Sequence, residues 1–537
     1  MKTKLMKDNQ PFQMKGFGII IVVLYFFQIS VYGQEPESVS FTTPKTLYFT
    51  GEKVWIDASV RLSSEASPSQ VLYVELIDGD SRSLAYTMIP LVEGKAVNFL
   101  SLSDQLPSAN YLLRVYTRVS PYLDLNTGVA QQLITVINPS VPPRVSTTSK
   151  KGSAPWSGTE LPEVRTSEAL ALLTREISTG SEFAGISIAN PFLSEEQASI
   201  PSSIYASLKS KPILPELFGH ILEVKVPSPD TTLTYFLSVH GKQSALYTAH
   251  PDQQGAMYFD IGGLKHWDKI ILQLENGQEM PGLAPVDPVI ETTFKADFKL
   301  PELVLDESDL EFLTQWLKAS RVETLFTERY QEDSVQIVTG FVADYSYKLD
   351  DYTRFETVET VIREYVPSAA VRTRDRRKEF RLLNQANNSV FDANPLILID
   401  AMPVFDSDLL SVFNPKQIQT LEVLNREFYL NDRTYPGVLS FSSYQNNFGL
   451  YPLAPNARFF DYVGLRPWID LDRAQFSRKI EAKHVPDWRS IWLWRGKGEE
   501  TPQISLPETG GVFVIWEKMK SSSGEVQVRK RYFRYLD

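Results

Sequence analysis

Side chains that commonly do chemistry are sparse in this sequence. The 537 residues include five histidines and no cysteine. Without cysteine the chain has no disulfide, thiolate metal site or cysteine nucleophile. The histidines stand singly, and the sequence has neither a paired-histidine metal motif, nor a serine elbow, nor a phosphate-binding loop. We therefore predict a protein that is not an enzyme, with no catalytic residue, cofactor or metal site.

Asp400 is the carboxylate whose position most resembles that of a catalytic acid. It directly follows four consecutive apolar residues, 396–399, which predict a buried strand. Enzymes with parallel sheets often place functional groups at strand ends, and a pair of carboxylates can hydrolyse glycosides. The interpretation that we favour is that the Asp400 carboxylate caps the turn after the strand. A carboxylate-dependent hydrolase is the alternative.

Basic residues crowd one short stretch of the C-terminal half: Arg372, Arg374, Arg376 and Arg377. The chain as a whole is acidic, with 54 Lys and Arg against 65 Asp and Glu and a net charge of -11. This balance argues against a general nucleic-acid binder, whose affinity depends on basic residues that neutralise phosphates. The four arginines could bind an acidic partner or anionic lipid head groups. The alternative is that they lie on a solvated hairpin without a binding role. We treat them as candidate interaction residues.

Large aromatic residues gather near the C-terminus, interleaved with prolines. This composition predicts irregular loops with bulky anchors, the residue types that dominate interface hot spots. The same side chains are suited to stacking on sugar rings, or to filling a core beneath long loops. The candidate interaction residues here are Trp468, Trp488, Trp492 and Trp494.

Residues 1–33 have the pattern of a secretory signal peptide. Lysines precede an apolar run over 16–27, and small residues end at Gly33. Such a run is too short to cross roughly 30 Å of hydrocarbon comfortably, and an uncleaved anchor is the alternative. No other segment approaches transmembrane length. The sequence thus predicts an exported chain without a transmembrane segment in its mature part.

Strand-like periodicity dominates the rest of the chain. Alternating apolar residues separated by turn signals predict a β-sandwich over 34–138. Residues 139–162, rich in Pro, Ser, Thr and Gly, predict a linker, and strands return as a second sandwich over 220–300. The predicted fold class is mainly β, with tandem immunoglobulin-like sandwiches followed by an α+β module. The other predicted segments are 163–219 (mixed, partly β), 301–450 (the α+β module) and 451–537 (aromatic-rich loops and C-terminal strands).

Both sandwich regions resemble domains of exported multidomain proteins of Bacteroidetes-type bacteria. Residues 47–56, LYFTGEKVWI, resemble the entry of a macroglobulin-like domain of the second-domain type. Residues 213–221 and 255–259 are similar to parts of a carboxypeptidase-regulatory-like sandwich. The resemblance implies that the first sandwich is macroglobulin-like and that the second is carboxypeptidase-regulatory-like.

The C-terminal half resembles the plug domain of TonB-dependent receptors. The family pattern has Gly after the strand-end Asp, where this chain has Ala401. A plug normally fills a barrel of some twenty-two strands, and the sequence that follows is too short to form one. The resemblance therefore implies a plug-like module without its own barrel. The similar segments are 395–404, 418–424 and 437–441, with Asp400, Pro403 and Gly437 as motif residues.

These resemblances imply a role in the cell envelope. We predict a non-enzymatic scaffold or interaction protein associated with the bacterial outer membrane, in the periplasm or at the cell surface. Its plug-like module would engage an outer-membrane protein such as a β-barrel. The alternatives are a surface protein that binds carbohydrate or another nutrient through the aromatic residues, and the hydrolase that uses Asp400.

Overall fold

The computed structural model describes residues 36–144, 151–194, 200–210, 213–334, 341–478, 484–520 and 526–536. The predicted signal peptide, 1–33, lies outside these residues. Strands dominate the described chain, which confirms the predicted mainly β class. None of the described helices combines the length and the apolar character that crossing a membrane requires.

The first β-sandwich packs two sheets around a core that the period-two pattern predicts. Val54, Ile56, Ala58 and Val60 alternate along one strand, and all four are fully buried. Alternate residues of a strand point to the same face, so these side chains face the second sheet. One sheet contains β1 (Glu37–Thr42), β3 (Lys53–Leu62), β4 (Glu65–Ala66) and β7 (Lys95–Ser101). The other has the order β2 (Leu47–Phe49), β9 (Ala130–Ile137), β8 (Ala109–Thr117), β5 (Val71–Ile77) and β6 (Ser83–Pro90).

A strand from far along the chain completes the second β-sandwich. This strand is β31 (Arg458–Asp461), which pairs antiparallel with β17 (Trp267–Leu274). The sandwich therefore extends beyond the predicted range 220–300. Its other strands are β13 (His220–Lys225), β14 (Tyr235–Gly241), β15 (Ala245–Ala249), β16 (Ala256–Gly262) and β18 (Ala284–Pro285).

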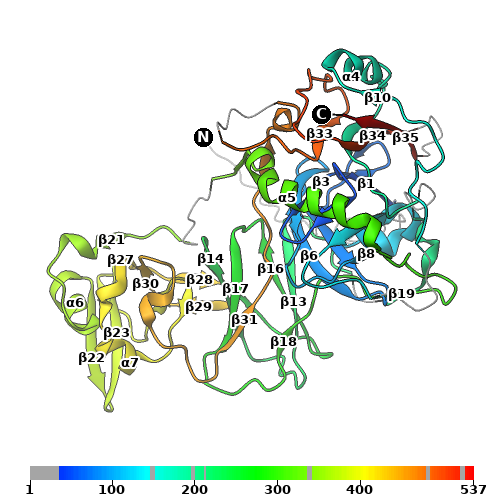
Figure 1. Cartoon of the computed structure of the whole chain (residues 1–537). Helices are drawn as coiled ribbons and strands as arrows, with labels where there is room; N and C mark the ends of the chain where they lie inside the picture. The colour runs from blue at the N-terminus through cyan, green and yellow to red at the C-terminus, as the bar shows by residue number, and fades with distance from the viewer. Residues whose placement is uncertain are drawn as a thin grey trace, which may run out of the picture.

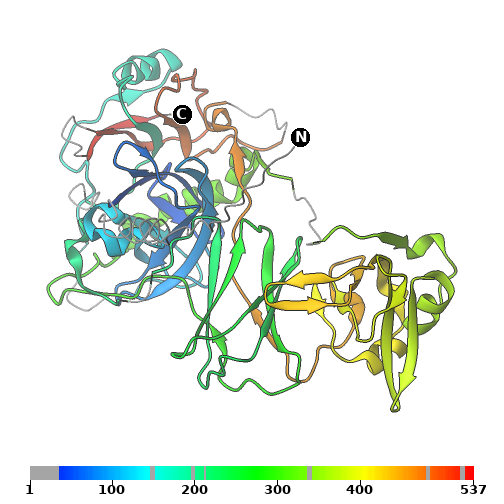
Figure 2. The same ribbon diagram turned by 180° about the vertical axis from the view of Figure 1, so that it is seen from behind.

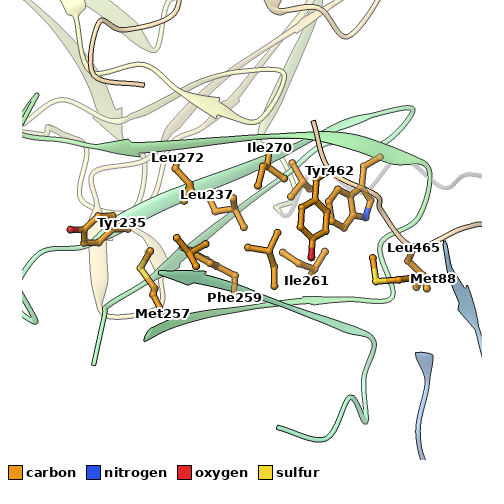
Figure 3. Close-up of a cluster of buried hydrophobic side chains, with 14 of the residues drawn as sticks. Met88, Tyr235, Leu237, Met257, Phe259, Ile261, Ile270, Leu272, Tyr462 and Leu465 are labelled. Atoms are coloured by element: carbon orange, nitrogen blue, oxygen red, sulfur yellow. The ribbon is translucent and has the colours of Figure 1, made fainter. Parts of the chain in front are cut away.

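The two sandwiches share one hydrophobic core. Figure 3 shows Met88 of the first sandwich beside Leu465, and Tyr462 among the side chains of the second sandwich in the same cluster. A polar network crosses the same boundary, because Glu216 accepts a hydrogen bond from Tyr73 Oη at 2.9 Å and pairs with His220 Nδ1 at 2.9 Å. All three of these polar side chains are essentially inaccessible to water. Separating the sandwiches would expose both the apolar core and an ionised group, so the two sandwiches pack as a unit.

Residues 341–450 form an α+β unit, named the distal module below. Its central sheet has β25 (Leu396–Ile399) parallel to β30 (Val438–Ser443), as expected for two buried apolar strands. Thr357 caps helix α6 (Val358–Tyr365) by accepting from Thr360 N. The other elements are β21 (Tyr345–Lys348), β22 (Ala369–Arg374), β23 (Arg377–Asn384), β24 (Ser389–Val390), β26 (Met402–Pro403), α7 (Ser407–Val412), β27 (Ile418–Leu424), β28 (Phe428–Leu430) and β29 (Arg433–Tyr435).

A fourth unit joins two distant parts of the sequence in one sheet. Helix α5 (Leu310–Thr327) packs on this sheet through Trp316, whose ring centroid lies 5.8 Å from that of Phe513. The sequence assigned this helix to the α+β module, so that boundary was wrong. The sheet has the order β10 (Glu163–Val164), β35 (Val526–Tyr535), β34 (Gly511–Lys520), β11 (Phe183–Ile188) and β33 (Ile491–Gly496), and α4 (Ser167–Thr174) precedes β11.

Short elements connect these units. Two-stranded pairs are formed by β12 (Tyr205–Leu208) with β19 (Thr292–Phe294), and by β20 (Tyr330–Glu332) with β32 (Ile469–Leu471). The short helices α2 (Ser120–Leu123) and α3 (Leu125–Gly128) lie in the first sandwich, and the 3₁₀ turns are η3 (Ser202–Ile204), η4 (Glu307–Asp309), η5 (Leu349–Asp351), η6 (Pro415–Gln417), η7 (Phe448–Leu450) and η8 (Arg473–Phe476).

The four units form an elongated arrangement with the distal module at one end. Figure 1 shows the first sandwich and the C-terminal sheet together on one side, the second sandwich in the middle and the distal module beyond it. Figure 2 shows the same order from behind, with the β22–β23 hairpin projecting from the far end. The chain runs out to this end and returns through β31 to the C-terminal sheet.

Candidate functional site

A large cleft lies where the two sandwiches and the distal module meet. Its volume is about 1540 Å³. The first sandwich contributes Leu84 to Thr87, the second contributes His240 and Trp267, and the distal module contributes Asp400 and the turn 442–448. Ligand sites commonly lie at boundaries between domains, so this cleft is a candidate binding site.

Asp400 lies at the edge of this cleft and organises a turn. One carboxylate oxygen accepts from Ser443 N at 2.7 Å, and the other accepts from Ser443 Oγ at 2.6 Å and Phe448 N at 2.8 Å. The side chain is 6% exposed. Because both oxygens already hold protein donors, these contacts support the capping interpretation over hydrolysis.

Asp400 and Ala401 form the two-residue turn between β25 and β26. The strands are paired on either side of it, with Ile399 opposite Met402. Both turn residues have positive φ, 48° for Asp400 and 67° for Ala401, as the turns favoured in two-residue hairpins require. The chain thus makes the tight turn without the glycine of the family pattern.

The other two plug-like motif residues, Pro403 and Gly437, lie in closely packed parts of the fold. Pro403 is buried in β26, and its carbonyl accepts from Gln273 Nε2 of the second sandwich at 3.4 Å. Gly437 has φ 91°, and a Cβ there would lie 2.3 Å from the carbonyl oxygen of Leu424. Only glycine fits this position, so these contacts favour positioning roles for both residues.

Polar contacts and strained backbone fix the turn after β30 against the second sandwich. Asn446 Nδ2 donates to Gly241 O and to Ser244 Oγ. Asn446, Phe448 and Leu450 all have positive φ, between 51° and 65°. Such conformations cost about 1–3 kcal/mol each and persist where surrounding contacts enforce them. Sequence reasoning missed this site, whose local signal is merely a polar turn, because the partner residues lie about 200 positions earlier in the chain.

The predicted arginine cluster lies together on the projecting hairpin of the distal module. Arg372, Arg374, Arg376 and Arg377 are all exposed. Among the described residues, the single ion pair that involves any of the four is a 3.9 Å contact between Arg374 Nε and Asp375 Oδ2. The hairpin therefore presents four guanidinium groups to solvent, although Arg372 lies opposite Glu379 in the strand register.

Two of the predicted aromatic interaction residues are core residues instead. Trp492 and Trp494 are 0% and 1% exposed, and both lie in β33, every residue of which is buried. The Trp492 ring is 4.0 Å from that of Phe513 between centroids. The prediction that they lie in irregular loops and bind a partner was therefore wrong, because β33 is a strand of the C-terminal sheet, with Trp492 in one hydrophobic core and Trp494 in another.

The other two tryptophans differ in accessibility. Trp488 is half-buried and packs against the same core as Trp492. Trp468 is half-buried and lines a groove of about 860 Å³ together with Tyr330, Asp470 and Arg473. Of the four predicted tryptophans, Trp468 is the one placed at a groove. Across the described chain, no three His, Asp or Glu side chains gather closely enough to hold a metal ion.

Comparisons with known proteins add little to this geometry. No family model matches the chain, and no curated protein matches it. The Escherichia coli alpha-2-macroglobulin in its native conformation aligns with 94% of this chain at 9% identity and a TM-score of 0.16. A Salmonella alpha-2-macroglobulin mutant aligns with 93% at 11% identity and a TM-score of 0.16, and a tetra-tandem repeat of a large adhesion protein aligns with 93% at 7% identity and a TM-score of 0.14.

The chain spans about a quarter of the two macroglobulins, 27% and 23% of their lengths, and 99% of the adhesion repeat. These similarities are too low to carry an argument about function. The β-sandwich assignment therefore depends on the sheets and cores described above.

Proposed function

We propose that this protein is an exported, non-enzymatic interaction protein of the bacterial outer envelope, and that the distal module is its docking end. The observation that carries the proposal is the projecting hairpin with four exposed arginines. The resemblances to macroglobulin-like, carboxypeptidase-regulatory-like and plug-like domains agree with such a role. The two sandwiches then act as a spacer that holds the distal module away from the C-terminal sheet.

The hairpin is arranged at a cost to its own stability. Arg374 lies directly opposite Arg377 in the strand register, and like charges in such pairs are destabilising by a few tenths of a kcal/mol up to about 1 kcal/mol. Asp375 and Arg376 at the tip both have positive φ, 50° and 66°, a conformation that Arg adopts rarely. Since these features do not stabilise the fold, they favour a role in binding.

The chemistry of the hairpin favours a partner with carboxylates. The planar guanidinium group donates paired hydrogen bonds to carboxylate oxygens, which a lysine cannot do. Four such groups on an exposed ribbon also raise the rate of association with a negatively charged surface. We propose an outer-membrane protein with an acidic surface, such as a β-barrel, as the partner.

A charge-reversal experiment tests this proposal. A photo-crosslinking residue is placed at Thr373, which is exposed between two of the arginines, and cells are irradiated before outer membranes are isolated. We expect one membrane protein to be captured, and we expect capture to fall at least tenfold with Arg374→Glu and Arg376→Glu together. Rising salt should weaken binding of the purified partner to the unmodified hairpin.

Arg61→Glu with Lys225→Glu is the matched control, because both residues are exposed on the sandwiches and the change in charge is the same. The control should leave capture intact. Equal loss in both variants, or unchanged capture in the hairpin variant, would contradict docking through the arginines.

A second candidate function is carbohydrate binding at the groove around Trp468. The observation that favours it is an accessible indole beside Tyr330, Asp470 and Arg473. A glycan array should then show binding that is lost with Trp468→Ala. Trp488→Phe is the control, since Trp488 packs against the core, and glycan binding that survives Trp468→Ala would exclude this groove.

A further inference from the structure

A second cavity lies between the C-terminal sheet and the first sandwich, apart from the cleft and the hairpin. Its volume is about 310 Å³, within the range of small-molecule sites. Val514, Trp516 and Lys518 alternate along β34 and so point to the same face, and all three line the cavity. Phe41 and Leu133 of the first sandwich line it from the other side.

Trp516 forms a fixed wall of this cavity. Its indole lies against Gly185 of β11, where an added Cβ would meet the ring at 2.5 Å. Its Nε1 donates to the carbonyl of Pro44 at 3.3 Å, which ties the ring to the first sandwich. An aromatic surface held from two sides is preorganised for apolar contact.

Lys518 is a cation in this cavity without an anionic partner. Its Nζ donates to the carbonyl of Phe41 at 2.7 Å, but within the described residues no carboxylate lies close enough to form an ion pair with it. Burial lowers the pKa of Lys518 to about 8, against the opposing effect of the Glu182 and Asp57 charges. A desolvated ammonium group without a counter-charge is costly.

The nearby Lys45 shows the usual solution to this problem. That lysine also borders the cavity, but its Nζ lies 3.0 Å from Glu52 and 2.6 Å from Glu323. The chain thus supplies two carboxylates to the buried Lys45 and none within ion-pair distance to the half-buried Lys518. An anion from outside the chain would compensate Lys518.

Several other polar side chains around the cavity, Thr43, Gln131, Gln132 and Asn190, already have protein partners. Thr43 Oγ1 donates to Lys45 O and accepts from Gln132 Nε2. The amide of Gln131 donates to Ile200 O and accepts from Tyr205 Oη, and Asn190 Nδ2 donates to Thr46 O. Lys530 also lines the cavity, so the cavity combines an apolar surface with positive charge, which favours an anionic ligand over a neutral sugar.

We propose that this cavity binds a small anionic amphiphile, a carboxylate on an aliphatic chain, with its head group beside Lys518 and its chain against Trp516. Charge complementarity identifies the head group, and the indole, Phe41, Leu133 and Val528 identify the body. The site is separate from the arginine hairpin, so the protein would hold a lipid-like ligand at one end and a protein partner at the other.

Isothermal titration of the purified full chain with dodecanoate tests the proposal. We expect binding of dodecanoate, at least tenfold weaker binding of dodecanol, and no binding of dodecylamine. Dodecanoate affinity should fall as the pH rises past about 8, since the Lys518 ammonium loses its proton there. Lys518→Met should reduce dodecanoate affinity at least tenfold.

Lys518→Met keeps the apolar stem and removes a half-buried charge that has no ion pair among the described residues, so the variant should fold at least as well as the natural protein. Lys95→Met, at an exposed position of β7, is the matched control and should bind dodecanoate normally. Absence of dodecanoate binding, or equal affinity in natural protein and Lys518→Met, would overturn the proposal. Binding of dodecylamine as tight as that of dodecanoate would do the same.

Discussion

Among single residues, His240 shows how burial determines protonation at the cleft. The side chain is 2% exposed, its Nε2 lies 2.8 Å from Ser238 Oγ, and its ring meets Phe448 edge-on at 4.7 Å between centroids. Burial lowers the pKa of His240 to about 3, although the main chain of Asp400 partly opposes this shift. The imidazole therefore stays neutral in the folded protein under mildly acidic conditions.

This depressed pKa predicts that acid destabilises the fold through His240. Below pH 6.5 the unfolded chain binds a proton at this residue and the folded chain does not, so the free energy of unfolding falls with falling pH. The contribution should be about 2 kcal/mol between pH 8 and pH 5. Denaturant titrations at both pH values should show that His240→Gln removes this part of the pH dependence.

His250→Gln is the control, because His250 is exposed and contacts Asp432 at 3.1 Å. If His240→Gln and the natural protein lose the same stability between pH 8 and pH 5, then water reaches the His240 ring in the folded state.

At the scale of elements, sequence patterns predict most strands correctly but not always which parts of the protein pack against them. The runs 396–399 and 418–424 form strands where their apolar patterns place them, and the alternating run after Lys53 forms β3. Trp492 and Trp494 misled the prediction because nearby prolines suggested loops, while β33 is a regular buried strand. Local pattern identifies a strand, but which surface covers it depends on distant partners.

In the β25–β26 turn, Ala401 occupies a backbone conformation that suits glycine better than alanine. Ala401 has φ 67°, and an L-residue in this region costs about 1–2 kcal/mol, which glycine avoids. Part of that gain is lost because glycine makes the unfolded chain more flexible. Ala401→Gly should therefore raise the free energy of unfolding by about 0.5–1 kcal/mol in denaturant titrations.

A glycine substitution should change the free energy of unfolding in the opposite direction at Ala370, an exposed residue of β22 outside the positive-φ region. Ala370→Gly should lower stability by about 0.5–1 kcal/mol. Destabilisation by Ala401→Gly would mean that the methyl group of Ala401 makes contacts worth more than the backbone strain.

At the scale of the whole molecule, the units are assembled from segments that the sequence presents as separate. Strand β31 returns to the second sandwich, and β33, β34 and β35 join β11 in one sheet. Helix α5 also leaves the region where the plug-like pattern placed it and packs on that sheet. No local periodicity encodes such pairings, so the sequence predicts the sandwiches but neither the composite sheet nor the cleft between units.

A buried ion cluster holds three of these distant segments together. Lys45 and Glu52 belong to the first sandwich, and Glu323 belongs to α5. The Lys45 ammonium group lies between the two carboxylates, and its Nζ is 3.0 Å from the Oγ of Ser490, the residue before β33. Burial raises the pKa of Glu52 to about 7, a rise that the Lys45 charge opposes and the Glu323 charge enhances. Lys45 is thus the cation that pairs with both carboxylates in the interior.

Lys45→Met should accordingly destabilise the assembly by about 3–5 kcal/mol, because it removes the ammonium group that pairs with both buried carboxylates. The loss should shrink as the pH falls, since the raised pKa of Glu52 lets this carboxylate take up a proton in the folded state and lose its charge. Lys53→Met is the matched control: Lys53 pairs with Glu328 at 2.7 Å, but both side chains are partly exposed, so the expected cost is below about 1 kcal/mol. Urea unfolding of the full chain followed by tryptophan fluorescence measures both variants, because Trp316 and Trp492 lie in the core that the cluster borders. Similar small losses in the two variants would show that water screens the cluster, and the first sandwich, α5 and the C-terminal sheet would then be held together by apolar packing alone.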